Sequence, residues 1–516
     1  MSLLDMLTNG ANIGCCGPHY SRSTPNAATA RTSSEALSSS IAQEISLFHS
    51  VGPFPSPPFP NMVISSLGVR PKKNGKFRII MDLSRPFFYS VNDYIDRDCY
   101  SMQYCRVDDA VNHLCSVGPG AVMAKLDVKH AFRLIPVRSE DWHLLGYQFN
   151  DFYYFDIVLP FGLRSSPFLF CQLSEAVLWI FKHVTGHQRA LCYVDDFLFI
   201  TEPDRFACQS LINKMNLLCS ELGVPIATEK TEGPASSLTF LGINLDSVSQ
   251  TISLPPGKSA EIQSLLKTWS TKKKCSKTEL QSLIGSLQFA SKCVPAGRLF
   301  TRRMISLLTE SKNIKSIKIT NDFKLDLNWW ISFLPAWNGT ASFLCPNWSV
   351  SSSLDLFTDA SSLGCGGYFA GHWFSIPWPD WISLETFSIE FLEIIPIYIA
   401  CILWSDQFIN QRVSFSCDNL GACQAWAKLG SSSSSVLHLM RLIASVSAVH
   451  NFVVRIIHIP GLDNTIADSL SRLDLSRFRQ VAPHAADYPS PIPLIFPSLQ
   501  QAYISQKWTC KKSPKI

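Results

Sequence analysis

The stretch LCYVDDFLFI at 191–200 places two adjacent aspartates, Asp195 and Asp196, between two short apolar runs. Runs of this length that are rich in Val, Ile, Phe and Tyr predict two β-strands joined by a tight turn. A two-residue turn normally uses Asn-Gly or Asp-Gly because its central residues take positive φ, so turn chemistry does not explain the pair. The two carboxylates repel each other, and a bound divalent cation would remove that cost. A bound divalent cation would therefore explain the pair, and the rest of the chain must decide.

A third aspartate ends an apolar run further upstream. In AVMAKLDVKHAFRLIPV (121–137) a predicted strand delivers Asp127 at its end. If Asp127 lies against the hairpin, the carboxylates complete a two-metal site. Such a site aligns the attacking and leaving oxygens of a phosphoryl group.

Two further segments accompany this candidate metal site. LPFGLRSSPFLF (159–170) contains Gly162, which permits a close backbone approach, and Ser166 and Pro167, which favour the start of a helix. RPKKNGKFRIIMDLS (70–84) reads as a basic hairpin with cationic side chains suited to a triphosphate. These side chains are Lys72, Lys73 and Arg78.

A second group of carboxylates follows strand ends and helix faces in the last third of the chain. Taken alone, each is more typical of a helix cap or a solvated acid, but the set suits a second two-metal phosphodiester hydrolase. Glu390 lies three residues before one of them and could share its helix face. The four candidates are Asp359, Glu393, Asp418 and Asp468.

The net charge of +5 is unevenly distributed. Residues 258–324 hold fourteen Lys and Arg against four Asp and Glu. A solvated helix face is the simplest interpretation of a charge run, but this local excess favours a phosphate backbone as partner. The side chains predicted to contact nucleic acid are Lys272, Lys273, Lys274, Arg298, Arg302 and Arg303.

Other features narrow the class of protein. Seventeen cysteines without C-x-x-C pairs indicate reduced thiols inside a cell rather than disulfides or zinc. The first residues lack the pattern of a signal peptide, and the apolar run at 388–404 is too short and too charged to predict a membrane span. We expect an intracellular protein of the cytoplasm, the nucleus or both.

The ordered motifs from about 62 to 250 resemble those of a reverse transcriptase. In order they are the basic hairpin, L-D-x-x-x-A-F, P-F-G-L-x-x-x-P, Y-V-D-D, Lys230 and TFLGINL. The resemblance implies that Asp127 and Asp195 bind both metals, with Asp196 in support, and that Lys230 lies near the nucleotide. It also places Phe132 at the position that excludes a ribose 2′-OH, although a core phenylalanine has the same spacing. Phe161 stands where retroviral members carry glutamine.

The second carboxylate group resembles a ribonuclease H domain over about 353–472. Glu393 is preferred to Glu390 because family members place the acid just before x-x-P-I, as here. The chain departs from retroviral members in one respect, because no histidine lies between Pro460 and Asp468.

Together the resemblances imply an α+β and α/β multidomain fold, a right-hand polymerase followed by a ribonuclease H-like domain. The implied activity is RNA-directed DNA synthesis with degradation of the RNA strand of the hybrid, using two Mg²⁺ or Mn²⁺ ions per site. The implied partners are an RNA template, a DNA primer, the RNA–DNA hybrid and dNTPs. The expected parts are a disordered segment or linker (1–45), fingers and palm (46–250), a basic thumb or connection (251–345), a ribonuclease H-like domain (350–475) and a poorly ordered Pro-rich tail (476–516).

The segments GPFPSPPFP, DLSRPFFYSVND and HIPGLDNTIADSLSR look most like DIRS-like retrotransposons, which move by a tyrosine recombinase. Gypsy-type elements are the nearer rival. The DIRS-like reading implies a recombinase or other element proteins acting in trans. Two other classes stay open, a domesticated and catalytically silent nucleic-acid binder and a structural particle protein.

Overall fold

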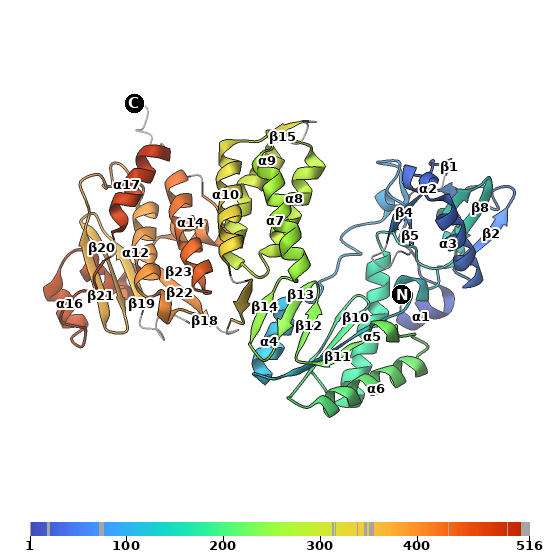
Figure 1. The fold of residues 1–516 in the computed structure, drawn as a ribbon, viewed down its shortest axis with the longest axis horizontal. Coiled ribbons are helices and arrows are strands. Elements are labelled where there is room, and N and C mark those ends of the chain that lie inside the picture. Colours follow the sequence, from blue (N-terminus) through green and yellow to red (C-terminus); the bar gives the residue numbers. More distant parts are fainter. Residues whose placement is uncertain are drawn as a thin grey trace. The chain divides into compact units, whose positions relative to one another are not determined.

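The computed structural model divides the chain into two compact units (Figure 1). The first unit comprises Met1–His113 and Gly120–Leu238, and the second comprises Leu114–Pro119 and Thr239–Ile516. The structure describes residues 2–17, 21–71, 77–311, 314, 316–337, 339–344, 348–349, 356–431, 433–492 and 494–506.

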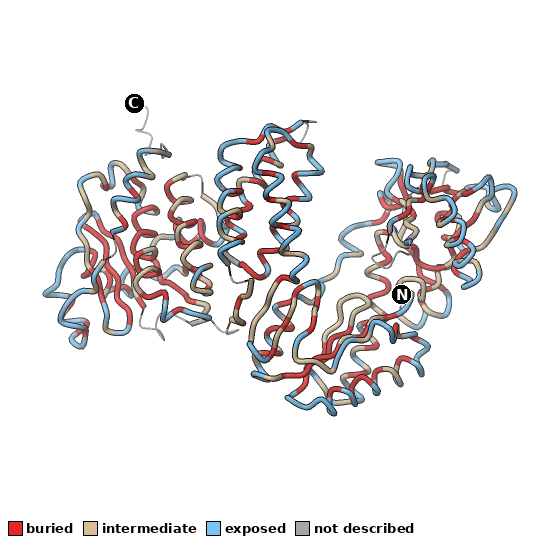
Figure 2. Tube along the Cα trace, viewed as in Figure 1, coloured by how far each residue is buried: buried red, intermediate tan, exposed pale blue. Residues whose placement is uncertain are grey.

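The centre of the first unit is a four-stranded sheet with the order β11-β6-β10-β9. β10 has five consecutive buried residues from Phe197 to Thr201, because one face of the sheet packs on helices and the other closes the core (Figure 2). α5 and α6 contact this sheet. The elements are β6 (Val122–Asp127), β9 (Ala190–Tyr193), β10 (Asp196–Thr201), β11 (Glu232–Ala235), α5 (Ser166–Thr185) and α6 (Arg205–Glu221).

α5 begins one residue earlier than the sequence suggests. Ser165 occupies the N-cap position and Ser166 is the first helical residue. The Ser166 hydroxyl donates to the Pro160 carbonyl at 2.9 Å, so it ties the helix to the preceding loop instead of capping it.

A second sheet and a separate hairpin complete the first unit. The sheet has the order β1-β3-β7-β8-β2, and β4 pairs with β5 antiparallel. The strands are β1 (Arg22–Ser23), β2 (Ser50–Phe54), β3 (Val63–Ile64), β4 (Ser66–Pro71), β5 (Phe77–Asp82), β7 (Gly146–Phe149) and β8 (Phe152–Asp156). Around them lie α1 (Leu3–Asn9), α2 (Ala28–Thr32), α3 (Ser34–Ser46) and the short 3-10 helix η2 (Ala131–Leu134).

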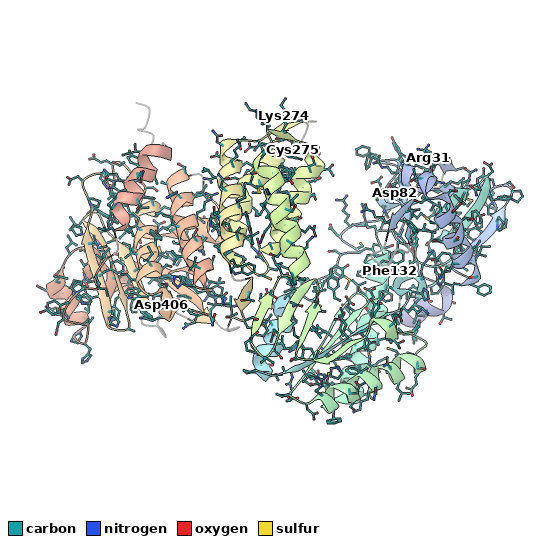
Figure 3. All side chains as sticks on the ribbon, viewed as in Figure 1. Arg31, Asp82, Phe132, Lys274, Cys275 and Asp406 are labelled. Atoms are coloured by element: carbon teal, nitrogen blue, oxygen red, sulfur yellow. The ribbon has the colours of Figure 1, made fainter. Side chains whose placement is uncertain are left out.

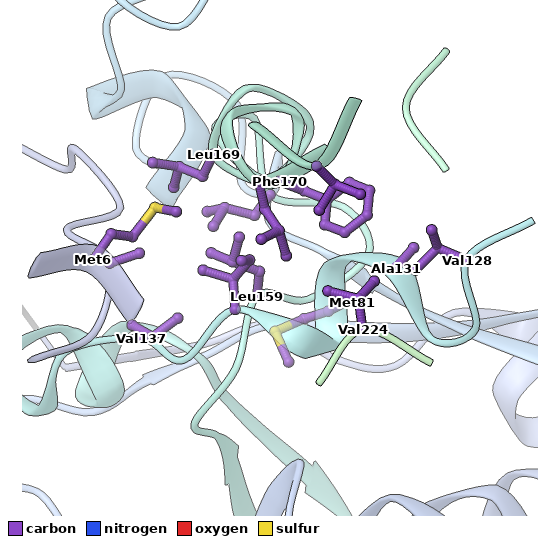
Figure 4. Close-up of a cluster of buried hydrophobic side chains, with 14 of the residues drawn as sticks. Met6, Met81, Val128, Ala131, Val137, Leu159, Leu169, Phe170 and Val224 are labelled. Atoms are coloured by element: carbon purple, nitrogen blue, oxygen red, sulfur yellow. The ribbon is translucent and has the colours of Figure 1, made fainter. Parts of the chain in front are cut away.

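The expectation that residues 1–45 are disordered or a linker is wrong. α1 and α3 are regular helices, and Met6, Ile13 and Leu37 are fully buried in the main core of the first unit. Figure 4 shows Met6 among the side chains of this core. A few apolar residues are enough to anchor these helices, because each of them lies on the helix face that packs on the core. The many Ser and Ala residues lower the average hydrophobicity of the segment, so its composition does not indicate this face.

The second unit contains a sheet of order β12-β13-β14-β17 and a helical bundle with the two-stranded antiparallel sheet β15–β16. α8 starts with a capping box between Ser276 and Glu279. The strands are β12 (Ser237–Phe240), β13 (Ile243–Asp246), β14 (Thr251–Ser253), β15 (Lys274–Cys275), β16 (Ile317–Lys318) and β17 (Thr340–Ser342). The helices are α7 (Pro256–Ser270), α8 (Lys277–Ala290), η5 (Pro295–Thr301), α9 (Arg302–Glu310) and α10 (Asn321–Ala336).

The last part of the second unit contains two three-stranded sheets and the helices that contact them. β19, β20 and β21 are antiparallel, β18, β22 and β23 are parallel, and β19 lies beside β22. The strands are β18 (Trp348–Ser349), β19 (Leu356–Ala360), β20 (Gly364–Phe369), β21 (His372–Pro377), β22 (Arg412–Cys417) and β23 (Val453–His458). The helices are α12 (Ile389–Leu403), α13 (Leu420–Lys428), α14 (Ser434–Val449), α15 (Thr465–Ser471), α16 (Leu475–Val481) and α17 (Ile495–Gln506).

The carboxyl-terminal tail is more ordered than expected up to residue 506. Phe478 of α16 is fully buried against Tyr368 and Trp373, with ring centroids 6.3 and 5.0 Å away. An aromatic anchor of this kind holds a short helix that propensity alone would not stabilise. Within the described residues, no helix is both long and apolar enough to cross a membrane.

Burial of the amino-terminal helix predicts a stability effect. Leu37→Ala should lower the free energy of unfolding of the first unit by about 2–5 kcal/mol, because it empties space in a closed core. Leu4→Ala is the matched control: Leu4 is 76% exposed, and its loss should cost no more than about 0.5 kcal/mol. Urea unfolding of both variants makes the measurement, and equal midpoints would contradict the packing described for α3.

Candidate active sites

Three of the predicted carboxylates meet at one end of the β6–β10 pair. Asp127 ends β6, Asp196 begins β10, and the two residues are directly opposite in the antiparallel register. The Val128 amide donates to the Asp195 carbonyl at 2.9 Å, which fixes the turn between β9 and β10 against β6. Val194 takes a positive φ of 57° in this turn, the conformation that a tight hairpin demands.

The electrostatics at this end of the sheet favour a cation. Burial and the neighbouring Asp195 carboxylate raise the pKa of Asp196 to about 6. The Lys230 ammonium lies 2.6 Å from one carboxylate oxygen of Asp127 and partly neutralises it. Carboxylate oxygens are the donors that Mg²⁺ and Mn²⁺ prefer, and clustered carboxylates are stabilised by such an ion. The residues present therefore fit a divalent metal.

A cavity of about 640 Å³ opens beside these groups. Asp195, Lys230, Ala131 and Phe161 line one part of it. The lining also includes polar side chains of α3, a segment that the sequence did not associate with the site. These are Ser39, Ser40, Gln43 and Glu44.

A buried charge network supports this part of the lining. Arg133 of η2 forms ion pairs with Glu44 at 2.9 Å and with Asp156 at 2.5 Å. Although burial opposes its charged form, the Asp156 and Glu44 carboxylates hold the pKa of Arg133 above its ordinary value. Sequence reasoning missed this network because its members are far apart in the chain, and only the sheet brings them together.

Two predicted nucleotide contacts lie close to the cavity. The Phe132 ring packs against Phe161 and Phe170, with centroids 5.2 and 5.7 Å apart, and Figure 3 labels its place in the first unit. Gly162 has a φ of 117°, and a Cβ there would collide with the Met81 carbonyl. The close approach of this loop to β5 accounts for Gly162 without a ligand.

The basic hairpin is only partly described. Lys72 and Lys73 lie outside the described residues. Arg78 is in β5, where its backbone pairs with that of Arg70 in β4.

The four later carboxylates come from four different elements of the second unit. Asp359 lies near the end of β19, Glu393 lies on α12, and Asp418 directly follows β22, while Asp468 lies on α15. Burial, followed by the Asp418 and Asp468 carboxylates, raises the pKa of Asp359 to about 7, although a Ser471 hydrogen bond opposes the rise. Burial and the Asp359 and Asp418 carboxylates raise the pKa of Glu393.

Glu390 lies apart from this group. It accepts a hydrogen bond from the Ser431 hydroxyl at 3.3 Å, whereas Glu393 faces Cys417 and Asp418. The helix therefore directs Glu393, and not Glu390, toward the other acids.

Four neighbours of the acids were not foreseen. Ser471 donates to Asp359 at 2.6 Å and Asn464 donates to the same carboxylate at 3.3 Å. Arg472 and Arg477 hold the two oxygens of Asp468 at 2.7 and 2.8 Å. The i+4 spacing of Arg472 from Asp468 was a usable signal, since such pairs face each other on a helix.

In the basic region, residues 258–324, some of the predicted contact side chains are exposed and others form ion pairs within the protein. Lys273, Lys274, Arg298 and Arg302 are exposed. Figure 3 labels Lys274 beside Cys275 in β15. Lys272 pairs with Glu279 at 2.5 Å.

The prediction that Arg303 contacts nucleic acid needs correction. Its guanidinium lies 3.2 Å from Asp326, which is fully buried and also pairs with Arg441 at 3.3 Å. A buried carboxylate without its partners would be costly, so a structural role accounts for Arg303.

The arrangement of the first unit, with three acids at the end of a sheet beside a cavity, defines a site suited to metal-assisted phosphoryl transfer. Residues 70–245 match the family model described as reverse transcriptase (RNA-dependent DNA polymerase). They form a reverse transcriptase domain.

Comparison with individual proteins agrees with this assignment. The Transposon Tf2-3 and Tf2-4 polyproteins of Schizosaccharomyces pombe are 22% identical over 258 residues, which is 48% of this chain and 18% of each relative. The chain thus matches less than a fifth of the length of these curated relatives.

Two solved structures share the fold. A foamy viral protease-reverse transcriptase with double-stranded DNA has a TM-score of 0.53 at 16% identity, over 88% of this chain and 73% of that one. Another foamy viral protease-reverse transcriptase, solved with RNA/DNA hybrid, has a TM-score of 0.51 at 17% identity, over 86% of this chain and 56% of that chain.

The raised pKa of Asp359 predicts a pH-dependent stability. Because the folded-state pKa lies above the unfolded value, the contribution of this group to stability is full below about pH 4 and is lost as the pH rises through about 7. Asp359→Asn should reduce the loss of unfolding free energy between about pH 4 and 8 by a few kcal/mol. The measurement is chemical denaturation with a chelator present.

Asp463→Asn, at an exposed position in the 3-10 helix η7 (Gly461–Asp463), is the matched control and should keep the parent profile. Parallel profiles for the parent and Asp359→Asn would show that burial does not perturb this carboxyl.

Proposed function

We propose that the chain is an RNA-directed DNA polymerase with associated ribonuclease H activity. It copies the RNA of a retroelement into DNA by two-metal phosphoryl transfer and degrades the RNA strand of the resulting hybrid. The observation that carries the polymerase part is the register that sets Asp127 opposite Asp196, inside a segment that matches the reverse transcriptase family. This pairing concentrates carboxylates where a phosphoryl group would react.

The polymerase site would hold its metal ions through Asp127 and Asp195, with Asp196 in support. When bound, the ions supply charge neutralisation at the reacting phosphate and orient the attacking 3′-OH. The Lys230 ammonium borders the same cavity and is suited to contact the nucleotide phosphates. Lys72, Lys73 and Arg78 are proposed for the same triphosphate. Gly162 is also proposed as a nucleotide-binding residue, in a loop that closely approaches the backbone of β5.

Sugar selection is assigned to Phe132. Its ring packs on Phe161, which lines the cavity, and on Phe170 of α5. A ring held by two aromatic neighbours is rigid, and rigidity is what exclusion of a 2′-OH requires.

The nuclease part rests on the electrostatic coupling of Asp359, Glu393, Asp418 and Asp468. We propose that they hold two further Mg²⁺ or Mn²⁺ ions per site. Support comes from a foamy viral protease-reverse transcriptase that is solved with RNA/DNA hybrid and aligns with 86% of this chain. Arg472 and Arg477 pair with the two carboxylate oxygens of Asp468, and a bound metal ion would take the place of at least one of these pairs.

The proposed domains are fingers and palm (46–250), a basic thumb or connection (251–345) and a ribonuclease H-like domain (350–475). The proposed partners are an RNA template, a DNA primer, their hybrid and dNTPs. The sequence motifs favour a DIRS-like element, with a recombinase or other element proteins in trans, over a gypsy-type element. We place the protein inside the cell, in the cytoplasm, the nucleus or both.

The two proposed metal sites should be separable by isosteric substitution. Asp195→Asn removes a charge from the first site, so primer extension on an RNA template should fall by orders of magnitude while cleavage of a preformed hybrid survives. Glu393→Gln should do the reverse. Both assays are run in Mg²⁺ on the same purified variants.

Glu390→Gln is the control, because Glu390 shares the helix with Glu393 but bonds to Ser431. It should change neither activity by more than a small factor. Loss of both activities in folded Asp195→Asn that still binds hybrid would refute the two-site proposal.

The exposed lysines of the β15 region should contribute to duplex affinity. Joint replacement of Lys273 and Lys274 by Ala should flatten the salt dependence of double-stranded DNA binding by up to about 0.9 in log K per log salt for each phosphate that is no longer neutralised. Lys272 is kept because it pairs with Glu279 in the α8 capping box.

Lys214→Ala is the control for a general charge effect, since Lys214 is exposed on α6, far along the chain from the basic region. A salt slope that is unchanged in the double variant would remove these lysines from the interface.

A further inference from the structure

The thiol of Cys417 lies among the acids of the second site. The proposed two-metal hydrolysis by four carboxylates does not require a thiol. Cys417 ends β22 and is 1% exposed. Its sulfur lies 3.8 Å from a carboxylate oxygen of Glu393. One potential ligand atom from each of Glu393, Cys417 and Asp418 lies within 4.8 Å of the others. Among the described residues, this is the single group of three metal-ligating side chains that close together.

The separation matches the edge of a tetrahedral metal site. With Zn–S of about 2.3 Å and Zn–O of about 2.0–2.2 Å, a sulfur and an oxygen on one tetrahedral ion are about 3.6 Å apart. Glu393 and Cys417 therefore need to move by only a few tenths of an ångström. Mg²⁺ takes oxygen ligands, so a donor set with sulfur selects a softer ion.

A second thiol is within reach of the first. The Cys423 thiol of α13 donates to the Cys417 carbonyl at 3.9 Å. Cys423 is outside the group whose ligand atoms lie within 4.8 Å of one another, so as a fourth ligand its thiol would turn from the Cys417 carbonyl toward the ion. The exposed side chain of Asp418 gives an ion access from solvent, while Glu393 and Cys417 lie behind it in the core.

We propose that Glu393, Cys417 and Asp418, with Cys423 as the fourth donor, form a binding site for a thiophilic divalent cation such as Zn²⁺ or Cd²⁺. Binding replaces the thiol proton of each coordinating cysteine by a metal–sulfur bond and releases that proton to solvent. Occupation withdraws Glu393 and Asp418 from the proposed Mg²⁺ site, so the ion inhibits hybrid cleavage. This inhibitory consequence rests on the proposed nuclease function, whereas the binding itself does not.

The binding test follows the cadmium–thiolate charge-transfer absorbance of the chelator-treated full chain during titration with Cd²⁺. The parent should give a larger saturating absorbance than Cys417→Ala. Cys401→Ala is the matched control, because Cys401 is equally buried but lies further along α12 than Glu393, toward the end of the helix. Exposed thiols such as Cys16 and Cys99 contribute the same background to every variant.

Because Cys417→Ala alters a buried position and could disturb packing, a second variant tests the site at an exposed position. Asp418→Asn changes an exposed side chain, and it should raise the Cd²⁺ concentration for half-saturation by about tenfold or more. Cys423→Ala should lower the saturating absorbance but leave a signal from Cys417. Equal titrations of the parent, Cys417→Ala and Asp418→Asn would overturn the site and return Cys417 to the role of a small buried hydrophobe.

The functional test measures cleavage of a preformed hybrid in Mg²⁺ with increasing Zn²⁺. Half-inhibition of Cys417→Ala should need at least about tenfold more Zn²⁺ than half-inhibition of the parent or Cys401→Ala. Identical inhibition in all three would overturn the inhibitory overlap. A chain that cleaves no hybrid in Mg²⁺ alone would refute the proposed nuclease function, and the absorbance titration would still decide the cation site.

Discussion

The antiparallel pairing of β6 with β10 is the contact on which the proposed polymerase site depends. It sets Asp127 opposite Asp196 and anchors the Asp195 turn through the Val128 amide. The pairing brings like charges together at the end of a buried sheet, which costs free energy that β10 recovers through its buried apolar residues. The fold thus maintains a local repulsion that a divalent cation would relieve, and the Lys230–Asp127 ion pair reduces it.

Buried charges hold the surroundings of both sites. In the first unit, Arg133 joins α3 to β8 through Glu44 and Asp156. In the second unit, Asp326 of α10 binds Arg303 and Arg441, and so connects the helical bundle to α14. Burial raises the pKa of Asp326, and the two arginines oppose that rise. Loss of one partner would leave an uncompensated charge, so each network specifies one arrangement of its helices.

Because a thiol lies at the second site, the acids proposed to bind Mg²⁺ could also bind a thiophilic cation. Glu393 approaches the sheet from α12 at the level where β22 ends, and the residue at that strand end is Cys417. A carboxylate and a thiol then share one small volume. Hard and soft ions would compete there for the same acids, and the available metal would decide which one binds.

The sequence by itself determined where the acids lie in their elements, because a run of apolar residues that ends in a carboxylate is a local pattern. Asp127 and Asp359 were predicted at strand ends and lie at or next to them, and Asp195 was predicted at a hairpin tip and lies in the turn between β9 and β10. The tertiary structure decided what each residue meets. Residues of α3 line the cavity, Arg303 forms an ion pair with Asp326, and the Cys417 sulfur lies close to the Glu393 carboxylate. Periodicity reports which side of an element is apolar, but partners far apart in the chain are set by sheet register and helix packing, which no local pattern encodes.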